Sequence, residues 1–391
     1  MATGSKDVPL VYLIAGEPSG DRLGARLIAA LREETQGGVR ISGVGGPEME
    51  KLGLTPLFPM ADLSVMGVAE VLPRLPLILA RIQQTVTDVR ARLPAVVVTI
   101  DAPEFSFRVA ARLKSADIPL IHYVAPSVWA WRPGRAAKIA KFLDHLMTLL
   151  PFEPPYFEAE GLSATYVGHP VVESDYGDGN GFRHRHGIAT EAPLIAALPG
   201  SRISEVSRLL PIFTKTIARL TEIFPNLRVV MPTVETVAST VRHRLEGWPI
   251  PVIVIDTEGE KIDALAAADV SLAASGTVAL ELAMSGTPAV ITYRMNPISG
   301  WLAKRLIHVR FANLVNLILD HEAIPERLLN RCRPEVLIDD LSELLGNPDA
   351  QAAQRTAYDQ ALTELGRGGD VPPSRRAARV VLSVIRSTAP R

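Results

Sequence analysis

Short aliphatic and β-branched runs alternate with longer amphipathic stretches along most of the chain. Such runs are typical of strands buried on both faces of a parallel sheet, and the stretches between them have helical spacing. Repeated strand–helix–strand units predict an α/β fold with a doubly wound parallel sheet. The first group of strands is expected at Val8–Ala15, Arg40–Val44, Ala95–Ile100, Pro119–Val124 and His145–Leu150.

The alternation pauses at Ser174–Gly187, whose polar, glycine-rich composition is typical of a linker or an exposed loop. It then restarts, so a second doubly wound sheet is expected, and after Pro334 the pattern is purely helical. The second group of strands is expected at Leu194–Leu198, Arg228–Met231, Val252–Asp256, Val270–Ala273 and Ala289–Tyr293. Helices are expected at Arg22–Glu34, Leu75–Leu93, Phe105–Ala116, Ser204–Phe224, Lys261–Ala268, Thr277–Met284 and Arg375–Ile385.

Two domains suit a chain of 391 residues, because domains commonly have roughly 100–200 residues. We expect an N-terminal Rossmann-like domain at 1–172 and a C-terminal one at 173–366. A helix at 367–391 is expected to pack back on the N-terminal domain or to exchange with the partner chain of a homodimer. Ligands of such sheets bind at the carboxyl ends of the strands, so the two domains are expected to face each other across a cleft.

Composition excludes several classes of protein. The formal net charge of −1 gives no indication of nucleic-acid binding, and the single cysteine, Cys332, suits a reducing cytosol. Residues 1–7 lack the apolar core of a signal peptide, and no apolar run reaches the roughly 18 residues of a membrane span. Val65–Ile82 is apolar but interrupted by charges and prolines, so it could lie on a membrane surface without crossing it.

Two predicted helix starts in the C-terminal half could bind an anion. Gly200, Ser201 and Arg202 follow one strand, and free N–H groups at a helix start favour a phosphate there. An ordinary capped helix with a solvent-facing arginine explains this motif equally well. Ser275, Gly276 and Thr277 follow a second strand and leave room for a diphosphate.

Glu281 is a lone charge in an otherwise apolar helix, one turn after the second of these motifs. Such a carboxylate should have a partner, and it could accept hydrogen bonds from a ribose. The alternative is a solvated surface glutamate. Two anion sites at one sheet edge suggest a nucleoside diphosphate. No Walker loop and no G-x-G-x-x-G fingerprint follows the first strand, which weighs against phosphoryl transfer and dinucleotide redox chemistry.

The N-terminal half has acidic and aromatic residues after its strands. Glu17, Ser19 and Asp21 follow the first strand and supply acceptors for sugar hydroxyls, although Asp21 could instead be the N-cap of 22–34. Asp101 ends a nearly apolar strand, where partial desolvation can raise its pKa toward the range of a general base. The alternative is an N-cap of the following helix.

An aromatic and cationic segment follows the next strand. Trp129 and Trp131 suit sugar rings or acyl chains, and Arg132 suits a phosphate, although domain packing would also explain the segment. His169 precedes the linker and is expected to fix the hinge or touch the edge of the ligand. The remaining clustered histidines lack companions for a metal site.

Together these motifs resemble the lipid-A-disaccharide synthase family. Three residues depart from the family pattern: Ala125 replaces a serine, and Glu104 and Ser106 replace a common Asp and Asn. The matching segments run in order over most of the chain: Ala15–Asp21, Ile100–Phe105, Tyr123–Arg132, Leu150–Glu153, Val167–Pro170, Leu198–Val206, Ser275–Met284, Tyr293-Arg294 and Asn313-Leu314.

The resemblance implies an inverting GT-B glycosyltransferase of lipid A biosynthesis. It would join UDP-2,3-diacylglucosamine to 2,3-diacylglucosamine 1-phosphate (lipid X), giving the β-1,6-linked disaccharide 1-phosphate and UDP. It would need no cofactor and no metal, because helix N-termini and basic side chains stabilise the leaving diphosphate. The protein would be cytoplasmic and peripherally bound to the inner membrane of a Gram-negative bacterium.

The resemblance also assigns roles to residues. Asp101 would be the general base that takes the proton of the acceptor 6-hydroxyl. The UDP donor would be bound by Gly200, Ser201, Arg202, Ser275, Gly276, Thr277 and Glu281, and more weakly by Arg294 and Asn313. The acceptor side would comprise Glu17, Ser19, Asp21, Ser127, Trp129, Trp131, Arg132 and His169, and the membrane would contact Val68, Leu72 and Leu75. The alternative for the last three residues is a packed helix of the N-terminal domain.

Three other functions remain open at this point. The chain could be another UDP-sugar transferase with a different acceptor, or a UDP-sugar epimerase of the same fold. It could be a dinucleotide oxidoreductase, which the missing fingerprint disfavours. It could also be a sensor that binds a nucleotide sugar without turnover.

Overall fold

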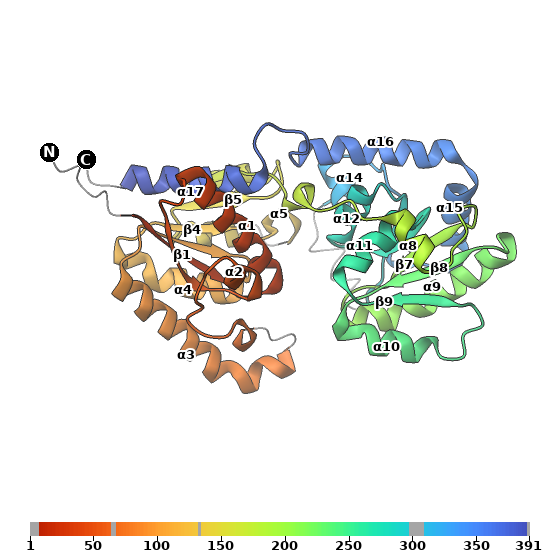
Figure 1. Cartoon of the computed structure of the whole chain (residues 1–391), viewed down its shortest axis with the longest axis horizontal. Coiled ribbons are helices and arrows are strands. Elements are labelled where there is room, and N and C mark those ends of the chain that lie inside the picture. The colour runs from red at the N-terminus through yellow and green to blue at the C-terminus, as the bar shows by residue number, and fades with distance from the viewer. Residues whose placement is uncertain (1–7, 64–67, 132–133, 297–308, 389–391) are drawn as a thin grey trace. The chain divides into compact units, whose positions relative to one another are not determined.

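The computed structural model describes residues 8–63, 68–131, 134–296 and 309–388, with backbone only for residues 68–72 and 131. The chain divides into two compact units (Figure 1). Unit 1 comprises Met1–Pro170 together with Gly368–Arg391, and unit 2 comprises Val171–Arg367. Each unit contains one parallel sheet covered by helices, so the predicted α/β class with two doubly wound sheets is confirmed.

The sheet of unit 1 has the strand order β2-β1-β3-β4-β5-β6. Its central strands are fully buried, because both faces are covered by helices. The sequence predicted all of these strands except β6. The strands are β1 (Leu10–Ala15), β2 (Arg40–Val44), β3 (Val96–Ile100), β4 (Leu120–Tyr123), β5 (His145–Thr148) and β6 (Ser163–Tyr166).

All strands of this sheet are parallel, but the order in which the chain adds strands reverses between β1 and β3. The chain runs from β1 outward to β2 and then returns to place β3 on the other side of β1. The helices after β1 and β3 are therefore expected on opposite faces of the sheet, and the crevice expected in this unit lies at the carboxyl ends of these strands, which is where open α/β sheets bind ligands.

Helices of unit 1 cover both faces of this sheet. Gly20 of α1 lies so close to β3 that a Cβ atom there would stand 3.0 Å from the carbonyl oxygen of Ile100. The helices are α1 (Pro18–Thr35), α2 (Pro47–Lys51), α3 (Val68–Arg92), α4 (Pro103–Leu113), α5 (Val128–Trp131), α6 (Gly134–Ile139), α7 (Pro154–Glu158) and α17 (Pro373–Thr388), with 3-10 turns at Met60–Asp62, Lys114–Ala116 and Pro170–Glu173.

The C-terminal helix α17 packs on α1 within unit 1 (Figure 1). Its apolar face is buried in the same core as β1 and β3, with Ala377, Ala378 and Val381 fully enclosed. Arg375 and Arg379 both donate to the carboxylate of Glu34 in α1, at 2.7 and 3.1 Å. The last helix is therefore an integral part of the N-terminal unit.

The sheet of unit 2 has the order β12-β11-β10-β7-β8-β9. Its strands are parallel, and the order in which the chain adds them reverses between β7 and β10. The crevice expected in this unit therefore lies between the loops after β7 and β10. The sequence predicted all of these strands except the three-residue β12. The strands are β7 (Leu194–Leu198), β8 (Arg228–Pro232), β9 (Val252–Ile255), β10 (Val270–Ala274), β11 (Ala289–Tyr293) and β12 (Glu326–Leu328).

The predicted linker at 174–187 is wrong in part, because Gly179–Arg185 forms helix α8. Asp178 caps this helix by accepting a hydrogen bond from Gly181 N, and Phe182 is fully buried. Arg183 anchors it to Asp269 at 2.8 Å. One buried aromatic side chain and a cap thus order a stretch whose glycines suggested a loop.

The remaining helices of unit 2 follow the expected pattern, and the described chain after Pro334 contains helices and no strand. None of the helices within the described ranges combines the length and apolar character needed to cross a membrane. The helices are α9 (Ile203–Ile223), α10 (Glu235–Leu245), α11 (Glu258–Ala267), α12 (Val278–Ser285), α14 (Leu314–Leu319), α15 (Pro334–Gly346) and α16 (Pro348–Glu364), with a 3-10 turn at Leu329–Arg331.

Candidate active site

Asp101 lies at the crevice of unit 1, directly after β3. Its carboxylate accepts a hydrogen bond from Ser19 Oγ at 2.8 Å, which joins the first turn of α1 to the residue that follows β3. The backbone at Asp101 and at Ala102 has positive φ values of 51° and 43°. Non-glycine residues rarely adopt this conformation, so the fold holds the Asp101 side chain in place at some cost.

Backbone contacts explain how this strained turn is held. The carbonyl oxygen of Asp101 accepts a hydrogen bond from Ser106 Oγ at 2.8 Å, and its N–H donates to Tyr123 in the next strand. The N-cap of α4 is Ala102 and not Asp101, so the alternative capping role does not apply. The Asp101 carboxylate is left half-buried at the mouth of the sheet, where it can accept a proton.

Glu17 is the N-cap residue of α1, and its carboxylate forms no capping hydrogen bond. Desolvation, reinforced by the negative charge of Asp101, raises the pKa of Glu17. Two carboxylates and one hydroxyl therefore gather at one crevice, from Glu17, Ser19 and Asp101. Such a group of acceptors suits a polyhydroxyl ligand, and the raised pKa of Glu17 favours its protonated form.

Asp21 has a structural role that corrects its expected place on the acceptor side. The residue lies inside α1, is 2% exposed, and accepts hydrogen bonds from the N–H groups of Gly46, Glu48 and Met49 at 2.9–3.1 Å. It therefore caps helix α2, and not the helix in which it lies. Its oxygens are committed to these donors and are buried away from a ligand.

The aromatic segment after β4 is tied to the loop after β5. Trp129 donates from Nε1 to the carboxylate of Glu153 at 3.1 Å, and its ring packs edge-on against Phe152. Ser127 in the same segment is exposed. The side chain of Trp131 and the whole of Arg132 lie outside the described residues. Glu153 was not among the predicted site residues, although it belongs to the segment Leu150–Glu153 that carries the family resemblance.

His169 follows β6 at the carboxyl edge of the unit 1 sheet. It lies one residue before Pro170, where the first segment of unit 1 ends. Burial, together with the positive charge of Arg26, lowers its pKa to about 4. The imidazole is therefore neutral at physiological pH. A neutral imidazole can donate or accept one hydrogen bond, which suits contact with a ligand better than charge stabilisation.

The crevice of unit 2 is bordered by both predicted anion-binding motifs. Gly200 follows β7 with φ of 115°, and a Cβ there would stand 2.6 Å from the side chain of Glu205, so only glycine fits. The N–H groups of Ser201 and Arg202 donate to Glu205 Oε2 at 3.1 and 3.3 Å. The start of α9 is therefore already filled by a carboxylate of its own first turn.

Glu205 also holds the side chain of Arg202. The guanidinium donates to Glu205 Oε1 at 3.0 Å while 69% of the Arg202 side chain is exposed. Tyr293 approaches the same oxygen at 3.4 Å. The sequence predicted free N–H groups here. The structure instead offers an oriented guanidinium as the group available to an anion, and Glu205 was missed because its reach back to the helix start depends on side-chain conformation.

The second motif borders the other side of the crevice. Ser275 is anchored, because its N–H donates to Thr292 and its Oγ to Ala312 at 3.0 Å. Gly276 and Thr277 are exposed at the start of α12. The carboxylate of Glu281 is 2.6 Å from Lys261 Nζ, and the Lys261 side chain is 13% exposed. Lys261 is thus the partner that a lone charge in this apolar helix required.

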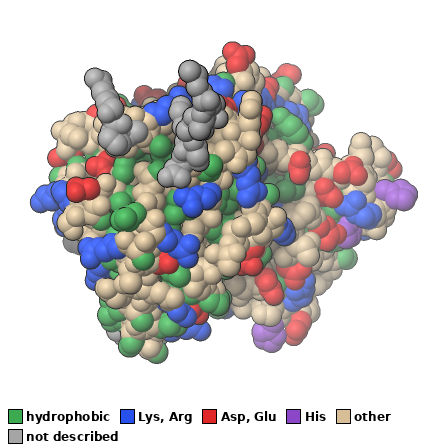
Figure 2. Space-filling view, turned by 60° about the vertical axis from the view of Figure 1, so that its left-hand side comes forward, with side chains coloured by type: hydrophobic (Ala, Val, Ile, Leu, Met, Phe, Trp, Pro, Cys, Tyr) green, Lys and Arg blue, Asp and Glu red, His purple; other side chains and the backbone are tan. Residues whose placement is uncertain are grey.

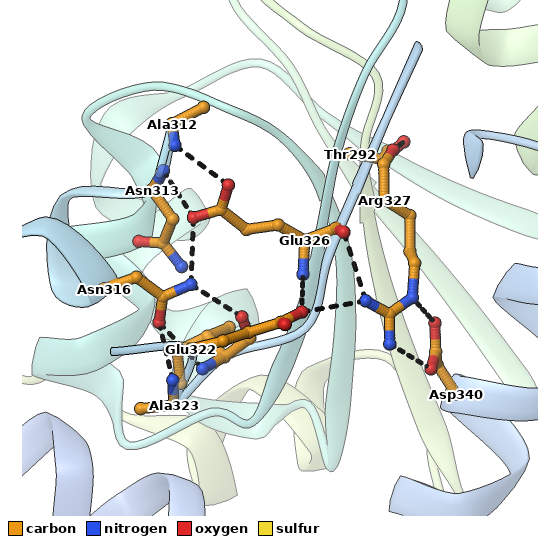
Figure 3. A network of polar contacts seen from close by, with 10 residues as sticks. Thr292, Ala312, Asn313, Asn316, Glu322, Ala323, Glu326, Arg327 and Asp340 are labelled. Atoms are coloured by element: carbon orange, nitrogen blue, oxygen red, sulfur yellow. Dashed lines mark hydrogen bonds and ion pairs between the residues drawn. The ribbon is translucent and has the colours of Figure 1, made fainter. Parts of the chain in front are cut away.

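A polar network beside Ser275 positions Asn313 (Figure 3). Glu326 in β12 accepts hydrogen bonds from the N–H groups of Ala312 and Asn313 and from Asn316 Nδ2, each at 2.9 Å. Asn313 is fully buried and caps α14 through Oδ1, whereas its Nδ2 has no hydrogen-bond partner among the described residues. A buried, unused donor costs free energy and is a candidate contact for a ligand.

Arg294 is exposed and donates to the carbonyl oxygen of Cys332 at 3.2 Å. Within the part of the chain that the structure describes, no group of three or more His, Cys, Asp and Glu side chains is arranged to hold a metal ion. The membrane-contact residues Val68 and Leu72 have side chains outside the described residues, and Leu75 is half-buried in α3.

Comparison with solved structures supports the fold. The Staphylococcus aureus MnaA–UDP co-structure aligns with a TM-score of 0.67 at 12% identity, covering 97% of this chain and 96% of that one. A putative UDP-N-acetylglucosamine 2-epimerase from Listeria monocytogenes aligns with a TM-score of 0.66 at 14% identity, covering 97% and 96%. Such neighbours are GT-B glycosyltransferases and epimerases, so the chain has the GT-B fold.

Comparison with protein sequences is more specific. A relative named lipid-A-disaccharide synthase in Rhodospirillum centenum is 56% identical over 380 residues, covering 96% of this chain and 94% of the relative. One of the same name in Paramagnetospirillum magneticum is 50% identical over 383 residues, covering 96% and 98%. The family model described as lipid-A-disaccharide synthetase matches residues 11–379. The chain therefore belongs to the lipid-A-disaccharide synthase family of glycosyltransferases.

Proposed function

We propose that this enzyme transfers 2,3-diacylglucosamine from UDP to the 6-hydroxyl of 2,3-diacylglucosamine 1-phosphate. One bond forms, between the acceptor O6 and the donor C1, and the bond between C1 and the diphosphate oxygen breaks. The acceptor proton goes to the enzyme and UDP leaves. Family membership supports the reaction, and the placement of polar groups at the crevice of each sheet supports the roles proposed for the residues.

The observation that carries the proposal is the position of Asp101. Its carboxylate is fixed at the crevice of unit 1 by a strained turn and by the 2.8 Å hydrogen bond from Ser19. We assign Asp101 as the general base for the acceptor hydroxyl. Attack by that oxygen on the face of C1 opposite the diphosphate gives inversion, from α in the donor to β in the product.

The crevice of unit 2 is proposed to bind UDP. Arg202 would contact the diphosphate as an oriented, mostly exposed guanidinium, and the N–H groups of Gly276 and Thr277 would receive it at the start of α12. Glu281, paired with Lys261, would accept from the ribose hydroxyls. Asn313 would donate from its unused Nδ2, with Gly200, Ser201, Ser275 and Arg294 bordering the site.

The acceptor side is proposed to comprise the groups around Asp101. Glu17 and Ser19 lie at the same crevice, and Ser127, Trp129, Trp131, Arg132 and His169 follow neighbouring strands. Asp21 is not part of this proposal, because α2 occupies its carboxylate. The proposed mechanism uses no cofactor and no metal, because cationic side chains and helix N–H groups suffice to stabilise the leaving diphosphate.

The acylated substrates imply work at a membrane surface. The first half of described α3 projects apolar residues, since Leu77 and Leu79 are 37% and 43% exposed, and every residue in 73–80 is half-buried or exposed. Figure 2 shows hydrophobic side chains lying among basic and acidic side chains on the surface. We propose that α3 contacts the inner leaflet, on the cytoplasmic side of the inner membrane of a Gram-negative bacterium.

Substrate omission tests the proposal against the epimerase and sensor alternatives. With donor and acceptor both present, UDP release and a tetraacyl disaccharide 1-phosphate should appear in equal amounts by mass spectrometry. With donor alone, neither should form. Conversion of the donor sugar without acceptor would indicate an epimerase, and UDP binding without any turnover would indicate a sensor.

A further inference from the structure

Glu153 is a buried carboxylate that joins two loops at the carboxyl edge of the unit 1 sheet. It is 3% exposed, and its Oε1 accepts the indole N–H of Trp129 at 3.1 Å. Its Oε2 accepts the backbone N–H groups of Leu149 and Leu150 at 3.2 and 3.0 Å. The segment after β4 is thereby tied to the loop after β5.

The partners of Glu153 are all hydrogen-bond donors, which only an ionised carboxylate can satisfy on both oxygens. Burying a carboxylate is costly unless such hydrogen bonds offset the loss of water. Among the described residues, no charged side chain shifts the pKa of Glu153. Its one side-chain hydrogen-bond partner among them is the indole of Trp129. Phe152, next in the chain, packs edge-on against the same indole at a centroid distance of 5.3 Å.

We propose that Glu153 is a positioning residue for the acceptor, which acts by fixing the ring of Trp129 through a hydrogen bond. This inference rests on the proposed function, which places the segment after β4 on the acceptor side. Glu153 does not touch the reacting atoms. Fixing the indole in advance removes the cost of ordering a large aromatic ring when the acceptor binds.

A pH dependence distinguishes this role from simple packing. Burial raises the pKa of Glu153 to about 7, while the hydrogen bonds from Trp129, Leu150 and Leu149 oppose that rise. Below this pH the carboxyl is protonated, and an O–H then faces N–H donors in place of a free acceptor. The indole should therefore be held firmly above about pH 7 and loosely below it.

The kinetic test compares Glu153→Gln with Glu158→Gln, an exposed glutamate on the adjacent short helix α7. The amide of Gln has one acceptor oxygen for two sets of donors, so its NH₂ group must face either the indole N–H or the backbone N–H groups of Leu149 and Leu150. Either orientation weakens the link that fixes the indole. Glu153→Gln should raise the KM for the acceptor about ten- to hundredfold and leave the KM for UDP-diacylglucosamine unchanged. Glu158→Gln should match the unmodified enzyme. Equal changes in both KM values, or none, would overturn the proposal.

A substrate-free measurement separates this proposal from the proposed function. The emission of Trp129 is taken as the difference between each protein and its Trp129→Phe counterpart. It should titrate with a midpoint near pH 7 in the unmodified chain and show no transition with Glu153→Gln. If the transition is present but the enzyme forms no disaccharide, the proposed function fails and the link between Glu153 and Trp129 stands. If the transition is absent, the link fails.

Trp129→Phe keeps the proposal testable should Glu153→Gln unfold. This variant leaves the carboxylate in place and keeps an aromatic ring, although a smaller one, and it removes the N–H donor. It should reproduce the rise in acceptor KM with little change in the thermal midpoint. The double variant should be no worse than the worse of the two single variants, because both substitutions remove the same interaction. Fully additive effects would contradict the proposal. An unchanged acceptor KM for Trp129→Phe would contradict the proposal.

Discussion

At the scale of single residues, the proposed mechanism uses side chains whose positions are fixed by neighbouring side chains. Ser19 fixes Asp101, Glu205 fixes Arg202 and Lys261 pairs with Glu281. Asp101 directly follows β3, Arg202 follows β7, and Glu281 lies on α12 after β10, and these strands border the points where the strand order of each sheet reverses. Catalysis at such a site requires groups placed in advance, because reorganising charges during the reaction would raise the barrier.

Replacing Asp101 by Asn tests its assignment as general base. The amide keeps the shape of the side chain and cannot take up the proton, so kcat should fall about 10²–10⁴-fold. Affinity for UDP, measured by calorimetry, should be nearly unchanged because UDP is proposed to bind in unit 2. Turnover equal to that of the unmodified enzyme would show that the proton goes elsewhere.

Arg202→Ala tests the proposed diphosphate contact. A hydrogen bond to a charged group contributes about 1.5–3 kcal/mol, so UDP should bind roughly ten- to hundredfold more weakly in calorimetry. Arg219→Ala is the matched control, because Arg219 lies on the same helix and its side chain is 70% exposed. Equal affinities of the two variants would contradict the assignment.

At the scale of elements, most of the fold could be predicted because buried parallel strands leave a strong apolar signal. The bounds of β2, β7 and β11 agree with those predicted, and β6 and β12 were missed. Strand β6 has no fully buried residue, and β12 has three residues including a charged pair. Helix α8 was missed because its glycines indicated a loop, and its one buried aromatic side chain, Phe182, gives no helical periodicity.

The site was predictable where local sequence decides the geometry, and not where distant side chains decide it. Positions directly after strands, such as Asp101 and Ser275, could be placed from the strand pattern alone. Asp21 could not, because its partners lie in α2, 25–28 residues further along the chain. Glu153 and Glu326 act through hydrogen bonds to other loops, which no periodicity in the sequence reveals.

Helix α3 is the element that tests membrane contact. Leu77→Ser with Leu79→Ser removes two exposed leucines, each of which gains about 1.5–3 kcal/mol when fully buried. Binding to vesicles containing phosphatidylglycerol, measured by sedimentation, should fall at least about tenfold. Leu93→Ser is the control, since Leu93 is 71% exposed just after the other end of α3. Equal vesicle binding by both variants would count against the proposal.

The attachment of α17 to α1 gives a pH-dependent stability. Hydrogen bonds from Arg379 and Arg375 lower the pKa of Glu34 below its ordinary value of 4.5. The folded state therefore gains stability that is fully present above this value and is lost as the pH falls through the lowered pKa. Glu34→Gln should lower the thermal midpoint at pH 7, and the difference should vanish in acid. A difference that persists at the lowest pH would exclude this ion pair as its cause.

At the scale of the whole molecule, the proposed catalytic base and the proposed diphosphate contacts lie in different units. Unit 1 carries the proposed base, the aromatic segment and the apolar helix, whereas unit 2 carries the proposed diphosphate contacts. The C-terminal helix returns to unit 1, so both ends of the chain belong to the unit proposed to receive the acceptor. This division predicts that donor and acceptor binding can be weakened separately, by substitutions in different units.

The most direct test of the account is the configuration of the product made from a donor labelled with ¹³C at C1. The account predicts that the label appears in a disaccharide 1-phosphate joined to acceptor O6, with the one-bond C–H coupling of a β anomer in the NMR spectrum. Asp101→Asn should slow the appearance of this signal at least about 100-fold while UDP still binds. A labelled α-linked product, or label retained in a UDP-sugar epimerised at another carbon, would contradict it.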